Sequence, residues 1–213
     1  MIRRRAVSIT LALAGLVAVG TGIAWASSIS LTSQKLGGAA VTTPAMFPVS
    51  VTTANKAGQT AGKVNNGDTI TIVWSQPLNA TTLCSGWSGT GGQGPLTFPW
   101  IITGNSSGND VLTTSGTNGT CSTGLHVGSI DLGATGYNTS TTAAIQFPTA
   151  SNTLSYSGTQ STLTVVLNGT TKGSPGTVSS GAPATWSCDS ALTDRSARTC
   201  GSNLAQSSAT VQF

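Results

Sequence analysis

The side chains that could carry out acid–base chemistry are few and lie far apart in the chain. The sequence has no glutamate, one histidine, His126, and five aspartates. The aspartates are Asp68, Asp110, Asp131, Asp189 and Asp194. Hydrolysis by paired carboxylates needs two acids that converge on a cleft, and a Ser-His-Asp triad would have to use the single histidine. Because the aspartates fall mainly in turns or where strands begin, we expect structural roles for them and no enzymatic activity.

Metal ligands are equally sparse. No two cysteines have the Cys-x2-Cys spacing of zinc sites, and the histidine lies in a stretch of alternating apolar residues. Oxygen ligands for calcium could come from two loops, with Asn65, Asn66 and Asp68 in the first and Asn109 and Asp110 in the second. Each loop supplies one carboxylate where a calcium site usually gathers several. We therefore expect hydrogen bonds that stabilise turns, and no metal or other cofactor.

The four cysteines predict disulfide bonds, because they are even in number and belong to a chain with an export signal, described below. Three connectivities can be drawn. Sequence order favours Cys84–Cys121 together with Cys188–Cys200, since each pair encloses a compact stretch rich in turn residues. In the chain-entropy model, loops of these lengths stabilise the fold by about 3–4 kcal/mol each.

The tryptophans offer a binding chemistry. Trp87 lies in a Ser-Gly-Trp-Ser-Gly loop and Trp100 follows Phe98-Pro99, so these two rings could form a flat platform on which sugars stack. The competing interpretation is that tryptophans fill the space between two sheets, which we favour for Trp74 and for Trp100. Trp87 is the leading candidate for a ligand-binding residue.

The amino terminus predicts export. Three arginines at positions 3–5 precede an apolar run over residues 6–23, and Ala24-Trp25-Ala26 closes it with small residues at both recognition positions. This pattern is typical of a cleaved signal peptide over residues 1–26, and an uncleaved membrane anchor is the alternative. The chain has nine basic residues, and removing the three leader arginines leaves six scattered ones against five aspartates, so we expect no nucleic-acid partner.

The remaining sequence predicts an all-β fold. Charged residues make up only 7% of the chain and glycine is abundant at 27 residues, a composition that disfavours helices. At residues 69–74, Ile70, Ile72 and Trp74 share one face of a strand. Further strands are predicted at 46–53, 97–102, 110–114, 125–132, 142–147, 153–156, 162–167 and 209–213. We expect a polar, flexible lead over residues 27–44, with an edge strand near 29–32, and one antiparallel sandwich of about eight to ten strands over residues 45–213.

The segment from Gly67 to Leu78 reads Gly-Asp-Thr-Ile-Thr-Ile-Val-Trp-Ser-Gln-Pro-Leu. It resembles the signature strand of bacterial immunoglobulin-like surface domains, in particular S-layer-type Ig-like modules. The specific resemblance covers about a dozen residues. It implies an immunoglobulin-like β-sandwich that acts as a spacer, an adhesion element or a part of a cell-surface assembly. The insert over residues 81–94 and the predicted disulfides depart from simple modules of this kind.

Together these features predict a secreted, non-enzymatic structural or adhesion protein that works outside a bacterial cell, at the surface or in an extracellular assembly. Its partners would be copies of itself or other cell-surface proteins, with no membrane contact after signal cleavage. In one concrete form, a strand from residues 27–44 adds to an exposed sheet edge of a neighbouring subunit. The alternative function is a carbohydrate- or cell-wall-binding module that uses Trp87 and Trp100 on a wall polysaccharide.

Overall fold

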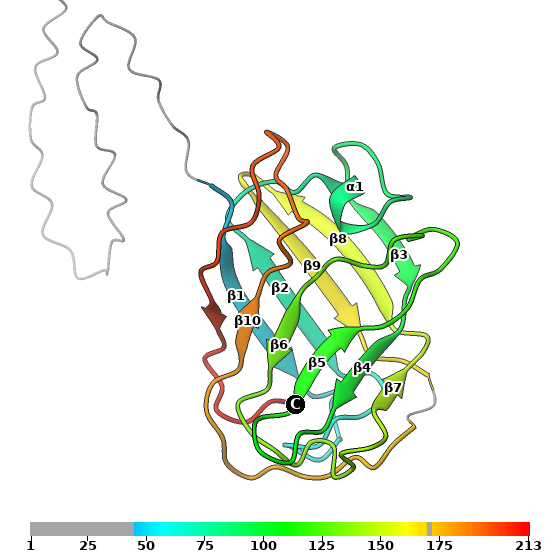
Figure 1. Cartoon of the computed structure of the whole chain (residues 1–213), viewed down its shortest axis with the longest axis vertical. Helices are drawn as coiled ribbons and strands as arrows, with labels where there is room; N and C mark the ends of the chain where they lie inside the picture. The colour runs from blue at the N-terminus through cyan, green and yellow to red at the C-terminus, as the bar shows by residue number, and fades with distance from the viewer. Residues whose placement is uncertain (1–44, 170–171) are drawn as a thin grey trace, which may run out of the picture. The chain divides into compact units, whose positions relative to one another are not determined.

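The computed structural model describes residues 45–169 and 172–213, and they form an almost entirely β domain (Figure 1). The predicted signal peptide, residues 1–26, and the predicted lead, residues 27–44, lie outside the described residues. Two antiparallel sheets of five and six strands pack against each other around one buried apolar cluster. Within the described ranges, no helix has the length and apolar character needed to span a membrane.

The first sheet contains the longest strands, in the order β1-β2-β9-β8-β3. Their bounds are β1 Pro48–Ala54, β2 Thr69–Trp74, β9 Gln160–Val166, β8 Ser151–Ser157 and β3 Gln93–Thr97. The strand predicted at 69–74 is confirmed as β2, and Ile70, Ile72 and Trp74 are buried as its alternation requires. β2 pairs with both β1 and β9, so it lies inside the sheet, while β1 and β3 form its two edges.

The second sheet is built from short strands in the order β11-β10-β6-β5-β4-β7. Their bounds are β11 Ala205–Gln206, β10 Thr185–Ser187, β6 Ser129–Asp131, β5 Val111–Thr114, β4 Trp100–Thr103 and β7 Ile145–Phe147. One helix of four residues, α1 (Ala80–Leu83), follows β2 and is capped by the Asn79 side chain. β10 and β11 were not predicted, because two or three residues carry too little alternation to identify a strand.

The single strand predicted at 97–102 is wrong, because this segment crosses from one sheet to the other. β3 ends at Thr97 in the first sheet and β4 begins at Trp100 in the second. Between them the Phe98 N–H donates to the Ala150 carbonyl at 2.9 Å, and Pro99 has no N–H to give to a ladder. A continuous run of apolar residues over 98–102 therefore conceals the corner between the two layers.

The final strand predicted at 209–213 is also wrong. Gln212 is fully buried, and its side-chain amide donates to the Ala209 carbonyl and the Ser207 hydroxyl, at 2.8 and 3.2 Å. The Gln212 N–H donates to the Tyr137 hydroxyl at 2.6 Å, while the Phe213 ring meets the Tyr137 ring edge-on at 6.2 Å. This segment is therefore held by side-chain contacts and not by the backbone hydrogen bonds of a β-ladder.

Tryptophans join the two layers. Trp74 of β2 and Trp186 of β10 meet edge-to-face with their centroids 5.1 Å apart, and both are fully buried. Trp100 of β4 is also fully buried, and its indole N–H donates to the Asn152 side chain of β8 at 2.9 Å. The second sheet thereby reaches the first through an apolar contact and a hydrogen bond in the interior. The predictions of core positions for Trp74 and Trp100 are confirmed.

We expect Trp186→Ala to lower the free energy of unfolding by about 3–5 kcal/mol, because it removes a large ring that both sheets contact. Urea denaturation followed by circular dichroism measures this loss. Leu204→Ala is the control, since Leu204 is 59% exposed and its truncation should cost less than about 0.5 kcal/mol. Equal losses in the two variants would show that the tryptophan contact does not hold the sheets together.

Candidate functional site

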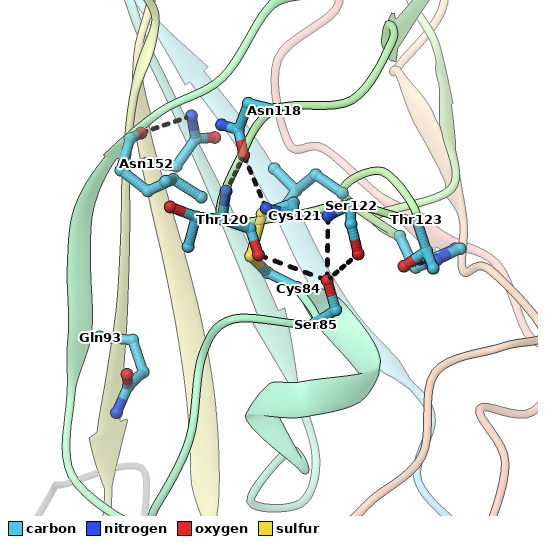
Figure 2. The surroundings of a disulfide bond; sticks show 12 residues. Cys84, Ser85, Gln93, Asn118, Thr120, Cys121, Ser122, Thr123 and Asn152 are labelled. Carbon is cyan, nitrogen blue, oxygen red and sulfur yellow. Dashed lines mark hydrogen bonds between the residues drawn. A yellow bond between two sulfur atoms is a disulfide. The ribbon is translucent and has the colours of Figure 1, made fainter.

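The first disulfide, Cys84–Cys121, joins the end of α1 to the loop between β5 and β6 (Figure 2). The Ser85 hydroxyl lies beside it and contacts the Thr120 carbonyl at 3.3 Å and the Ser122 hydroxyl at 3.1 Å. The Asn118 side-chain oxygen accepts the Thr120 and Cys121 N–H groups at 2.9 and 2.6 Å. The polar groups around the sulfur atoms therefore bond to one another and stiffen the loops.

The second disulfide, Cys188–Cys200, closes a loop that Asp194 organises from within. This buried carboxylate accepts the Ser196 and Arg198 N–H groups at 2.8 and 3.0 Å, and the Arg198 guanidinium approaches it at 2.6 Å. Both disulfides are those that sequence order favoured. Burial by itself raises the pKa of Asp194, but the hydrogen bonds from Arg198 and Ser196 and the Arg198 charge outweigh it and hold the pKa below its usual value.

The structure does not place Trp87 and Trp100 on an exposed platform. Trp87 is only 4% exposed and Trp100 is fully buried, so neither ring offers a face to a sugar. The Trp87 N–H donates to the Cys84 carbonyl at 2.9 Å, and a side chain at Gly86 would collide with the Thr120 carbonyl. The glycine-rich loop therefore packs closely against the loop that contains Thr120, and Trp87 belongs to the apolar core.

His126 has a partner that the sequence did not indicate. Its Nδ1 atom lies 3.0 Å from Asp189 Oδ2, and its Nε2 atom lies 3.4 Å from the Thr123 hydroxyl. This is the order of groups in an acyl-transfer triad, but 3.4 Å is long for a hydroxyl-to-imidazole hydrogen bond. Asp189 also accepts the Ala191 N–H at 2.8 Å. The pair therefore ties the β5–β6 loop to the loop of the second disulfide.

One serine, Ser106, lies in a Gly-x-Ser-x-Gly sequence over residues 104–108. A nucleophile elbow needs a strand followed by a helix, whereas these residues connect β4 to β5 in a hairpin. The Asn105 side chain accepts the Ser107 N–H at 3.1 Å, which is an ordinary turn contact. The only described histidine bonds elsewhere, to Thr123 and Asp189, so this motif does not assemble a triad.

The two aspartates that were considered as calcium ligands, Asp68 and Asp110, accept hydrogen bonds from the backbone. Asp68 is fully buried and accepts the Lys56 and Asn65 N–H groups at 2.9 and 2.6 Å. Burial raises the pKa of Asp68, and these two hydrogen bonds oppose the shift. Asp110 accepts N–H groups from Asn105, Gly136 and Asn138 at 3.1, 3.0 and 2.8 Å. Within residues 45–169 and 172–213, no three acidic, histidine or cysteine side chains gather as metal ligands.

A surface at the edge of the first sheet is the strongest candidate for interaction. Among the described residues β1 pairs only with β2, and its seven residues include no charged side chain. Phe47 and Val49 are 37% and 41% exposed, and Leu204, just before β11, is 59% exposed. The Gly201 N–H donates to the Met46 carbonyl at 2.8 Å, which brings the chain leading to β11 beside the start of β1. We call the unpaired side of β1 with Phe47, Val49 and Leu204 the β1 edge surface.

The other sheet edges are better protected. β3 contains Pro95, which has no N–H to give to an added strand. β7 has three residues, and Gln146 within it is already bridged to Lys172. β11 has two residues. Among the described strands, only β1 presents a long edge next to exposed apolar side chains. An irregular register at residues 48–50 limits regular pairing to the part that follows, where the Thr53 hydroxyl is bonded to the Gln212 side chain and the Phe213 N–H.

We expect Asp194→Asn to lower the free energy of unfolding by about 1–3 kcal/mol at pH 7, because the loop loses its charged acceptor. Since folding lowers this pKa, the ionised group stabilises the fold above its ordinary value of 3.8, and that contribution is lost as the pH falls through the folded-state pKa. Denaturation curves from pH 7 down to acid measure the difference between wild type and variant, which should shrink with acidification. A difference that does not change with pH would contradict this role.

Asp68 provides a control of opposite sign, because burial raises its pKa in the folded state. Relative to Asp68→Asn, wild type should lose stability as the pH rises from the ordinary value of 3.8 through the raised pKa. The same denaturation series therefore separates a charge that the fold stabilises from one that it disfavours.

No protein family model matches the chain, and no curated protein or solved structure matches it at a significant level.

Proposed function

We propose that the chain is a secreted, non-enzymatic structural or adhesion protein of the cell surface or an extracellular assembly. The leader over residues 1–26 supports export. Two disulfides are consistent with an oxidising compartment, where such bonds persist. The two antiparallel sheets are compatible with the immunoglobulin-like module that the Gly67–Leu78 segment resembles.

The observation that carries this proposal is the β1 edge surface. An uncharged sheet edge with no paired strand is a template for an added strand, because backbone N–H and C=O groups pair with little demand on sequence. Exposed apolar side chains beside the edge would lose contact with water when a partner binds, which favours association. The proposed occupant is a strand from residues 27–44 of a second copy, a polar stretch in which Ile29 and Leu31 alternate with serine and threonine.

The alternative, a wall-polysaccharide module built on tryptophans, has less support. Stacking requires an exposed ring face, and Trp87 and Trp100 are both buried.

We expect Val49→Lys to weaken self-association of the exported, oxidised protein by about tenfold or more, because it sets a charge beside the edge that receives the strand. Light scattering on size-exclusion fractions, over about a hundredfold range of concentration, measures the effect. The mass of the wild-type protein should rise with concentration. The expected tenfold loss of affinity in the variant corresponds to about 1.4 kcal/mol.

Thr153→Lys is the matched control. Thr153 is exposed on β8, which lies inside the same sheet between β9 and β3 and presents no free edge. This variant should associate as wild type does. A strictly monomeric wild-type protein would overturn the proposal, and so would equal weakening by both variants.

A further inference from the structure

A cavity of about 330 Å³ lies where the β1–β2 loop meets the segment at residues 172–178, both at the lower end of the view in Figure 1. Its volume falls in the range of roughly 300–1,000 Å³ that is common for small-ligand sites. The lining residues are Gln59, Lys63, Val64, Asn65, Asn66 and Pro175. The cavity is separate from the β1 edge surface, and ligand binding there does not require self-association.

The cavity is held open by fixed backbone. Gly62 joins its two walls, because its N–H donates to the Phe213 carbonyl at 2.6 Å and its carbonyl accepts the Val178 N–H at 2.9 Å. Gly62 has a φ of +77°, and any side chain there would collide with the Val178 carbonyl. Asp68 fixes the base of the loop through the Lys56 and Asn65 N–H groups. A ligand therefore meets a loop that is already ordered, which reduces the entropy lost on binding.

The polar side chains that line the cavity have unused hydrogen-bonding groups. Within the described residues, the side chains of Gln59, Lys63 and Asn66 take part in no hydrogen bond or ion pair, and Asn65 uses only its amide nitrogen, which donates to the Lys63 carbonyl at 2.7 Å. An amide offers both donors and an acceptor, which suits neighbouring hydroxyl groups that also donate and accept. The half-buried Pro175 adds an apolar surface against which the C–H face of a sugar ring can lie.

The segments that form the cavity carry lysines. The three lysines of the described residues, Lys56, Lys63 and Lys172, all lie on the two segments that form the cavity. Lys63 is the one that lines it. The neighbouring Asp68 is fully buried, and its oxygens accept hydrogen bonds from backbone N–H groups. Its carboxylate therefore does not form an ion pair with the Lys63 ammonium. An ammonium group beside unengaged amides favours an anionic, hydroxyl-rich ligand.

We propose that this cavity binds an acidic saccharide, with one uronate ring seated in it. The Lys63 ammonium pairs with the ring carboxylate. The amides of Gln59, Asn65 and Asn66 bond to ring hydroxyls, and Pro175 lies under the apolar face of the ring. The protein would then hold an acidic polysaccharide through a site at the end of the sandwich, separate from the edge that joins subunits.

The test is a titration of the ¹⁵N-labelled exported protein with trigalacturonate, using maltotriose as the uncharged saccharide of equal length. The Val49→Lys background weakens self-association during the measurement, and the cavity lies apart from β1, so failure here and failure of the proposed assembly are distinguishable. Saturable shifts confined to amides of residues 59–66 and 175–178 are expected with trigalacturonate, and weaker ones with maltotriose.

Lys63→Gln should weaken binding of trigalacturonate by about tenfold or more, while leaving the rest of the amide spectrum unchanged. Lys56→Gln is the matched control: it removes the same charge from the same loop, but Lys56 does not line the cavity, and it should change affinity less than about twofold. Absence of saturable shifts at about 10 mM trigalacturonate would overturn the proposal, since even weak specific sites are occupied there. Equal affinity for both sugars, equal effects of the two lysine variants, or shifts located elsewhere would also overturn it.

Discussion

The structure depends on the packing of its two sheets against each other. The four-residue α1 is the only helix within the described residues, so each sheet can bury its apolar face only against the other sheet. Trp74 and Trp186 make that contact at the centre, and Trp100 adds a hydrogen bond across the same interface. The second sheet has strands of only two to four residues and cannot be stable alone. Both sheets therefore depend for their stability on the apolar surface that they bury against each other.

The loops are ordered by aspartate and asparagine side chains that accept hydrogen bonds from backbone N–H groups. Asp68, Asp110 and Asp194 are buried and each accepts two or more backbone N–H groups, and Asn118 acts in the same way next to the first disulfide. Three of the five aspartates are thereby engaged with backbone N–H groups. The loop that Asp68 orders also lines the cavity that contains Lys63.

Sequence patterns predicted the parts of the fold that local alternation controls. The strand at 69–74 and the core position of Trp74 followed from alternation, and the two disulfides followed from order and spacing. The corner at Phe98-Pro99, the burial of Trp87 and the His126–Asp189 contact depend on segments that meet only in three dimensions, and no local signal predicts them. The cavity escaped prediction for the same reason, since Pro175 is distant in sequence from the loop that supplies the other lining residues.

The central claim is that the free side of β1 joins one copy of the protein to another. Hydrogen–deuterium exchange of the exported protein at low and at high concentration tests it most directly, because an added strand protects amides that face solvent in the monomer. The account predicts that protection in residues 50–54 rises with concentration, while the interior strand β8 changes little. Oligomers that form without any change in the exchange of β1 would contradict the account and assign assembly to another surface.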